Sequence, residues 1–263
     1  MSKTVLVLVP HPDDAEFGCG GTLALMTAAG ERVIIVIATD GSKGTFETEP
    51  ARLARLRSAE AAEAAQILGA EPPLMLGHPD LELDRLPAGY LRSEFVQLIR
   101  RHRPDIVISQ DPFNIQDLHP DHRVTAWAAA EAVNFAHLPS LHPEQLMADL
   151  QPHVVTEKYF YYPKSSEANK IVDISSMIEK KVAALAAHTS QVKFLVEDIF
   201  RQGQLAGVDI PAVLGNPPDP HLAALRYAVQ AEAAEMGQPA GYVYAEAFRY
   251  VRFHPFVEGL IQK

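Results

Sequence analysis

Residues 4–22 read TVLVLVPHPDDAEFGCGGT, and this stretch decides the fold class. Its first part, residues 5–9, is a run of Val and Leu without a polar residue, which is typical of a strand buried on both faces of a parallel sheet. Polar residues follow at once, where ligand sites form beyond the carboxyl ends of such strands. We predict a helix over residues 21–29, which Gly30 would stop.

The alternation of strand and helix continues through the first half of the chain. Strands are predicted at residues 33–38, 73–76 and 105–109, and helices at residues 52–68 and 90–102. Buried strands that alternate with helices in this way favour a parallel sheet covered by helices on both faces. The predicted fold class is therefore α/β, with a Rossmann-like, mainly parallel sheet.

The second half is less regular. Helices are predicted at residues 124–135, 176–188 and 222–236, strands at 158–162, 170–174 and 242–253, and a loop at 210–220. Ser176 and Glu179 have the spacing of a capping box at the start of the second of these helices. No internal repeat or linker-like stretch divides the chain. We expect one domain over residues 1–263, with a Rossmann-like core in 1–136 and a C-terminal elaboration in 137–263.

Composition excludes several classes of protein. With 263 residues, 48% hydrophobic and 21% charged, the chain is typical of a globular protein rather than a disordered one. A net charge of −10 argues against nucleic-acid binding. Cys19 is the only cysteine, so intramolecular disulfides and cysteine-based zinc sites are excluded. The apolar run at residues 5–9 is too short for a signal sequence or a membrane span, which predicts a cytoplasmic protein without a membrane partner.

A second polar segment follows the fourth predicted strand and reads DLHPDHR, residues 117–123. Like the first segment, it places histidine and aspartate beyond the carboxyl end of a buried strand, so both are expected at one edge of the sheet. Each segment alone could be an ordinary loop, because His-Pro is common in loops and aspartate often caps helices. The two together favour a functional site.

A dinucleotide site is one alternative for the first segment. Gly18 and Gly20 begin the pattern G-x-G-x-x-G, but Leu23 stands where the third glycine is required. Asp13 and Asp14 would also repel a pyrophosphate. We expect instead that these glycines let the backbone pass close to a neighbouring element.

Metal chemistry fits the two segments better. Two imidazoles and one carboxylate are typical of a catalytic zinc site with a position left open for water, and a further carboxylate can act as general base. Adjacent aspartates such as Asp13 and Asp14 point in different directions, so they can divide these roles. His119 and His122 can share one face of a helix start, one binding metal and the other facing substrate. Asp121 could orient one of the imidazoles.

The segments HPDDAEFGCGGT, residues 11–22, and HPDH, residues 119–122, resemble the PIG-L/LmbE family of zinc-dependent N-deacetylases, and look closest to its diacetylchitobiose deacetylase branch. The likeness extends over most of the chain, at residues 38–45, 57–60, 68–69, 79–80, 171–174, 188–191 and 244–248. The usual family motif has alanine and glutamate where this chain has Pro10 and Ala15. The ligand and base positions are intact.

The resemblance assigns roles residue by residue. It implies zinc on His11, Asp14 and His122. Asp13 matches the general base, and His119 matches the protonated histidine that stabilises the oxyanion or protonates the leaving amine. Asp121 matches the residue that orients His119.

The substrate-binding residues are open to more than one interpretation. Arg57 matches a substrate-contacting arginine, or is a solvated arginine on a helix face. Asp40 and Asp111 end strands and could bind sugar hydroxyls or serve as caps. His254 is either a surface histidine or, as the resemblance implies, a residue that reaches the pocket of a neighbouring subunit.

The function that the resemblance implies is hydrolysis of an N-acetyl group from an N-acetylated amino sugar, of the N-acetylglucosamine or chitobiose type, with release of acetate. Zn²⁺ is the expected metal, although the same ligands suit Fe²⁺, Co²⁺ or Mn²⁺. Relatives imply a homo-oligomer such as a hexamer. Two alternatives are an amidase that acts on a larger thiol-sugar conjugate and a metal-free sugar-binding module. Asp13 argues against the second, because a binding module needs no base.

Overall fold

The computed structural model describes residues 2–163, 167–253 and 255–261. In chain order its elements are β1 Thr4–Val9, α1 Asp14–Ala28, β2 Arg32–Thr39, α2 Pro50–Leu68, β3 Leu74–His78, η1 Leu83–Arg85, α3 Tyr90–His102, β4 Ile106–Gln110, α4 Pro120–Phe135, α5 Pro143–Leu146, β5 Glu157–Tyr161, β6 Lys170–Asp173, α6 Ile178–Ala187, α7 Thr189–Leu205, α8 Ile210–Val213, α9 Pro220–Gly237, η3 Gln238–Ala240, β7 Ala245–Val251 and α10 Pro255–Ile261.

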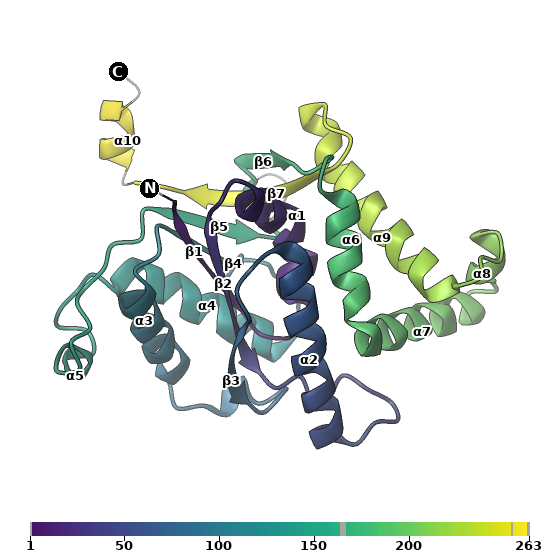
Figure 1. Cartoon of the computed structure of the whole chain (residues 1–263), viewed down its shortest axis with the longest axis horizontal. Helices are drawn as coiled ribbons and strands as arrows, with labels where there is room; N and C mark the ends of the chain where they lie inside the picture. The colour runs from purple at the N-terminus through teal and green to yellow at the C-terminus, as the bar shows by residue number, and fades with distance from the viewer. Residues whose placement is uncertain (1, 164–166, 254, 262–263) are drawn as a thin grey trace.

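The predicted α/β fold class is confirmed. One seven-stranded sheet has the order β3-β2-β1-β4-β5-β7-β6, and helices lie on both of its faces (Figure 1). The five strands from β3 to β5 are parallel, while β7 runs antiparallel to both β5 and β6. The strand order reverses between β1 and β4, which is where ligand sites form in open α/β sheets. The second half of the chain completes the same sheet.

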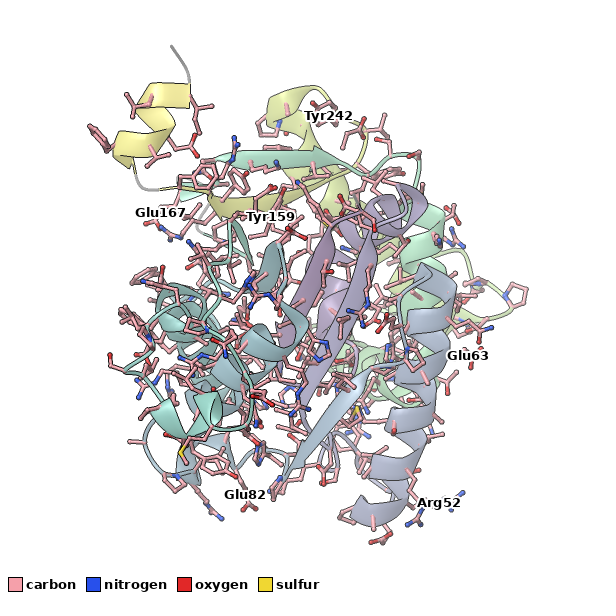
Figure 2. All side chains as sticks on the ribbon, turned by 60° about the vertical axis from the view of Figure 1, so that its left-hand side comes forward. Arg52, Glu63, Glu82, Tyr159, Glu167 and Tyr242 are labelled. Atoms are coloured by element: carbon pink, nitrogen blue, oxygen red, sulfur yellow. The ribbon has the colours of Figure 1, made fainter. Side chains whose placement is uncertain are left out.

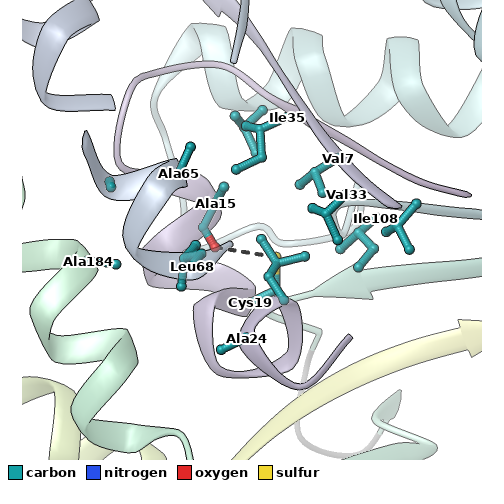
Figure 3. Close-up of a cluster of buried hydrophobic side chains, with 14 of the residues drawn as sticks. Val7, Ala15, Cys19, Ala24, Val33, Ile35, Ala65, Leu68, Ile108 and Ala184 are labelled. Atoms are coloured by element: carbon teal, nitrogen blue, oxygen red, sulfur yellow. Dashed lines mark hydrogen bonds between the residues drawn. The ribbon is translucent and has the colours of Figure 1, made fainter. Parts of the chain in front are cut away.

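The core forms on both faces of β1 because its residues are apolar without interruption. Val5, Val7 and Val9 pack toward α1 and α2, whereas Leu6 and Leu8 pack toward α3 and α4. Figure 3 shows the first of these clusters, with Val7 and Ile35 from the sheet opposite small residues of the helices. Exposed polar residues of α2 such as Arg52 and Glu63 lie on its outer side (Figure 2).

Helix α1 begins earlier than predicted. It starts at Asp14 rather than at residue 21, and it is broken at Cys19, where φ is −151° and ψ is 17°. The glycines of this segment serve close packing, as expected. A Cβ atom on Gly18 would lie 2.5 Å from the ring of Tyr161, and one on Gly21 would lie 2.7 Å from Ile174.

The break in α1 leaves backbone groups without helical partners, and an ion pair from the second half of the chain satisfies them. The carboxylate of Glu246 accepts hydrogen bonds from the backbone N–H groups of Gly21 and Thr22, at 2.9 and 2.8 Å. The Nζ atom of Lys181 donates to the Phe17 carbonyl oxygen and to Glu246, both at 2.7 Å. Both side chains are buried. Strand β7 and helix α6 therefore hold α1 in its broken form.

Other predictions for the second half were wrong in detail. The capping box did not form, because α6 begins after Met177 without a side-chain cap and Glu179 pairs with Arg226 of α9 instead. Helices α7 and α10 were not predicted, and α8 lies inside the expected loop. Strand β7 is shorter than the predicted strand at 242–253.

No helix within the described ranges is both long and apolar enough to cross a lipid bilayer.

The ion pair predicts a large loss of stability when one partner is removed. Glu246→Ala would leave Lys181 buried without its counter-charge, which costs about 3–5 kcal/mol in comparable cases. The free energy of unfolding in urea measures this loss. Glu235→Ala, an exposed position on α9, is the control and should change stability by less than about 0.5 kcal/mol. Equal stability of the two variants would contradict the role given to Glu246.

Candidate metal centre and active site

The two polar segments meet at the carboxyl edge of the sheet, between β1 and β4. His11 follows β1, and His122 lies in the first turn of α4, which Pro120 begins. The Nδ1 atom of His11 lies 3.1 Å from the Nε2 atom of His122. Asp14 completes a triangle, with Oδ2 3.2 Å from Nδ1 of His11 and Oδ1 3.5 Å from Nε2 of His122.

This triangle has the dimensions of a metal site. Zinc binds nitrogen and oxygen ligands at about 2.0–2.2 Å, so two ligands of one tetrahedral ion lie about 3.3–3.5 Å apart. The three separations are close to that value. Two imidazoles and a carboxylate also leave the fourth position of a tetrahedral ion open. A third imidazole is close by, since a ring nitrogen from each of His11, His119 and His122 lies within 4.8 Å of the others.

Each histidine of the triangle has a carboxylate at its other ring nitrogen. The Nδ1 atom of His122 lies 2.5 Å from Asp117. The Nε2 atom of His11 lies 3.2 Å from both Asp80 and Asp121. Such partners accept the ring N–H, so the nitrogen that faces the triangle keeps its lone pair for a metal. The hydrogen-bond network thus leaves Nδ1 of His11 and Nε2 of His122 as the ring atoms available to a metal.

The carboxylates favour positive charge in the triangle. Burial acts to raise the pKa of Asp14, but the charges of His122 and His11 hold it below its usual range. At Asp117 burial is also outweighed, by the hydrogen bond with His122, and the pKa falls to about 2. Burial disfavours the charged forms of His11 and His122, yet their carboxylate partners raise both pKa values. A divalent cation would compete with protons for the same ring nitrogens.

Asp13 pairs with Arg57 rather than with the triangle. The Nη2 atom of Arg57 lies 3.3 Å from Oδ2 of Asp13. Burial raises the pKa of Asp13 to about 6, although the charge of Arg57 acts to lower it. Its backbone has a φ of 110°, in a region that costs a non-glycine residue on the order of 1–3 kcal/mol and that concentrates at functional sites. A buried carboxylate with a pKa near neutrality suits a general base.

One of the two interpretations of Arg57 was wrong. Its side chain is only 4% exposed, so it is not a solvated arginine on a helix face. Its guanidinium donates hydrogen bonds to the carbonyl oxygens of Gly41 and Pro12, at 3.0 and 2.5 Å, and pairs with Asp13. These contacts fix the backbone on either side of the site and orient the carboxylate of Asp13. Arg57 therefore positions the site residues, and a contact between Arg57 and substrate stays a prediction.

His119 lies over the triangle but is oriented differently from expectation. Its ring centroid is 4.7 Å from that of His11. Its Nδ1 atom accepts a hydrogen bond from the backbone N–H of Asp121, at 3.2 Å, so its proton is on Nε2. The Asp121 carboxylate is instead bonded to His11 and to the backbone N–H groups of Leu81 and Leu83. Asp121 thus orients His11, and its contact with His119 is made through the backbone.

Asp111 has no role at the site surface. It is buried and pairs with Arg249, with Oδ2 2.6 Å from the guanidinium Nε. Asp40 accepts hydrogen bonds from the backbone N–H groups of Ser42 and Asp80, so it stabilises a loop. The prediction that these aspartates could bind sugar hydroxyls is wrong for Asp111, while Asp40 acts as the alternative cap. His254 lies outside the described residues.

Sequence reasoning missed two carboxylates of the site. Asp117 is the first residue of the segment DLHPDHR, five residues before His122. It follows the same predicted strand as the two histidines, and this position is the signal that could have identified it. Asp80 belongs to the stretch at residues 79–80 that resembles the family, but nothing in its local sequence connects it with His11. Only the return of the chain after β3 brings them together.

Comparison with known proteins places the chain among sugar deacetylases. The PIG-L family, described as GlcNAc-PI de-N-acetylase, matches residues 6–133. A diacetylchitobiose deacetylase from Thermococcus kodakarensis is 35% identical over 251 residues, covering 95% of this chain and 83% of the relative. The structure of N,N'-diacetylchitobiose deacetylase from Pyrococcus horikoshii in complex with an inhibitor is similar with a TM-score of 0.80 and 30% identity, over 98% of this chain and 88% of that chain. These matches confirm the resemblance.

The same fold also occurs in an enzyme of another class. GalB from Pseudomonas putida, the 4-carboxy-2-hydroxymuconate hydratase, has a TM-score of 0.69 at 20% identity, over 96% of this chain and 97% of that chain. At that identity the likeness concerns the fold alone. The activity of the present chain therefore has to be argued from its own site.

The triangle predicts how metal content depends on single residues. The purified protein should carry about one divalent metal per chain, and His122→Ala should lose it. Asp117→Asn should keep the fold but weaken metal affinity by about 10–100-fold, because it removes the acceptor at His122 Nδ1. Elemental analysis and chelator competition measure these changes. His137→Ala, at an exposed position, is the control. Full metal occupancy in His122→Ala would show that the ligands are others.

Proposed function

Because the chain belongs to the PIG-L family, we propose that it hydrolyses the acetamido group of an N-acetylated amino sugar to acetate and a free amine. Substrates of the N-acetylglucosamine or chitobiose type correspond best to the relatives. The observation that carries the proposal is the His11–Asp14–His122 triangle with the buried Asp13 carboxylate beside it. Hydrolysis of an amide needs an activated water and a base, and this arrangement supplies both.

A divalent metal, zinc in our proposal, would be held by Nδ1 of His11, Nε2 of His122 and the carboxylate of Asp14. When bound there it would lower the pKa of water and polarise the acetyl carbonyl group. The ligand set also suits Fe²⁺, Co²⁺ and Mn²⁺. A metal-free sugar-binding module is the weaker candidate, because it would leave the raised pKa of Asp13 without a use.

Asp13 is the proposed general base. Arg57 holds its carboxylate in place, and the raised pKa lets Asp13 accept a proton from the attacking water. The water oxygen forms a bond to the acetyl carbon, and the C–N bond then breaks. The proton taken by Asp13 is transferred to the amine nitrogen, which balances the reaction.

His119 is proposed to stabilise the oxyanion as a neutral donor. Burial and the neighbouring charges of His11 and His122 lower its pKa, which disfavours the imidazolium form. Its Nδ1 atom already accepts a backbone hydrogen bond, so Nε2–H is the available donor. An N–H group directed at the developing oxyanion stabilises the transition state more than the ground state. Because His119 is neutral in this assignment, Asp13 is the group that gives the proton to the leaving amine.

We further propose that the protein acts as a homo-oligomer. Large apolar side chains are exposed on the loop after β4 and on α4, beside the site: Phe113, Ile115, Leu118 and Trp127. The rings of Phe113 and Trp127 are in contact, with centroids 5.3 Å apart, and exposed apolar surface often marks an interface. The role of His254 that the resemblance implies stays a prediction. The cytoplasmic location remains a prediction.

A deacetylation screen tests the function directly. Acetate release should be detected from N-acetylglucosamine and N,N'-diacetylchitobiose, and it should be abolished by removal of the metal and restored by zinc. A larger thiol-sugar conjugate is included as the competing substrate. Turnover of that conjugate alone would show that the protein is an amidase of a different specificity.

The role of Asp13 is tested by Asp13→Asn. The variant should keep its metal, because Asp13 is not a ligand, and lose turnover by about 10²–10⁴-fold, as expected for a missing general base. Asp84→Asn, an exposed position, is the matched control. Loss of metal in Asp13→Asn would mean that Asp13 and Asp14 have exchanged roles, and near-normal turnover would place the base elsewhere.

A further inference from the structure

The loops that follow β2 and β3 are joined by hydrogen bonds beside the metal centre. The two strands are parallel neighbours in the sheet, so the loops after them meet at its carboxyl edge. The Oδ1 atom of Asp40 accepts a hydrogen bond from the backbone N–H of Asp80, at 3.2 Å. The backbone N–H of Lys43 donates to Oδ2 of Asp80, at 2.8 Å. Residues 38–45, which have no part in the proposed reaction, are therefore attached to a partner of His11.

The segment from Asp80 to Leu83 holds both carboxylates that contact the outer ring nitrogen of His11. One is the side chain of Asp80 itself, whose Oδ1 lies 3.2 Å from Nε2 of His11. The other is Asp121, which lies at the same distance from Nε2. The Asp121 carboxylate accepts hydrogen bonds from the backbone N–H groups of Leu81 and Leu83, at 2.6 and 3.0 Å. The orientation of the His11 ring therefore depends on the backbone of this segment.

The backbone of this segment is strained at Leu81. Its φ of 60° lies in the left-handed region, which is disfavoured for residues other than glycine. The Leu81 side chain is 43% exposed, so its packing does not hold the backbone in this conformation. A rotation of the peptide group between Asp80 and Leu81 would relieve the strain, but it would also turn the N–H away from Asp121. Hydrogen bonds have to oppose that rotation.

Lys43 binds the opposite end of the same peptide group. Its Nζ atom donates to the carbonyl oxygen of Asp80, at 2.5 Å, and to the carboxylate of Glu82, at 2.8 Å. The peptide group is thus held at its oxygen by Lys43 and at its nitrogen by Asp121. Hydrogen bonds from a charged donor are stronger than neutral ones, and Glu82 keeps the ammonium group in place.

We propose that Lys43 is a positioning residue of the metal centre. Its ammonium group keeps the peptide between Asp80 and Leu81 in the strained orientation in which Asp121 accepts its N–H and faces His11. The role rests on the proposed function, in that His11 is taken as a metal ligand. If Lys43 formed only a surface ion pair with Glu82, its removal would change little, because such pairs are weak and the Lys43 side chain is 38% exposed.

The first test is Lys43→Met, which removes the ammonium group and keeps most of the side chain. Metal affinity, measured by chelator competition, should fall about tenfold, the lower end of the range for groups behind a ligand, because Lys43 acts through the peptide. Hydrogen exchange of the Leu81 amide, followed by NMR, should become at least about tenfold faster as its bond to Asp121 opens. Lys193→Met is the control and should change neither quantity, since Lys193 is an exposed lysine of α7 that also pairs with glutamates.

The second test is rescue by glycine at position 81. Glycine adopts a φ of 60° without strain, so the peptide group would need no support from Lys43. The double variant Lys43→Met/Leu81→Gly should therefore bind metal within about threefold of the unmodified protein. A lysine that merely stabilised the loop would not be replaced by the loss of a leucine side chain.

Three results would overturn the role of Lys43: unchanged metal affinity in Lys43→Met, unchanged exchange of the Leu81 amide in that variant, or a double variant that binds metal no better than the single one. Failure of the proposed function gives a different pattern, with no acetate released or with metal retained in His122→Ala. The exchange measurement requires neither bound metal nor turnover, so in that case it still decides whether Lys43 holds the peptide group.

Discussion

The parallel pairing of β1 with β4 is the constraint on which the site depends. Val5 lies opposite Ile106 and Leu8 opposite Ser109, so the two strands end side by side. The segments that follow are separated by more than a hundred residues of sequence, yet both leave the sheet at the same edge. Without this register, His11 and His122 could not come within 3.1 Å of each other. The uninterrupted apolar run that buries β1 on both faces therefore also brings the residues of the candidate metal centre together.

The charges at this edge explain why a cation belongs there. Asp14, Asp80, Asp117 and Asp121 surround the imidazoles of His11 and His122 in a buried setting where negative charges repel one another strongly. Protons on the two imidazoles relieve the repulsion in part, as their raised pKa values show. A divalent ion bound there would relieve the repulsion at neutral pH, and each outer carboxylate would still accept the N–H of its imidazole. Asp13 pairs with its own cation, Arg57, which separates the proposed base from the proposed metal ligands.

The extent to which sequence predicted this structure follows from the range of the interactions. Periodicity identified the strands of the parallel core, and motif spacing identified His11, Asp14 and His122, because these signals are local. The partners of those residues are not local. Asp80 reaches His11 from the loop after β3, and Arg57 turns inward to Asp13 from a helix whose pattern gives no sign of it. The second half was predicted least well, because long-range contacts replace local signals there, as when Glu179 pairs with Arg226 instead of forming the expected capping box.

Through those long-range contacts, the second half of the chain holds helices of the first half in place. Glu246 and Lys181 hold the broken helix α1, whose first residue is the proposed metal ligand Asp14. In the same way Glu60 of α2 accepts hydrogen bonds from Thr189 and Ser190 at the start of α7, three residues from the arginine that orients Asp13. Residues of the motifs at 188–191 and 244–248 thus make structural contacts. They fix the two helices that carry the ligand and the positioning arginine, so a core made of residues 1–136 alone would present the right side chains without the geometry that the chemistry requires.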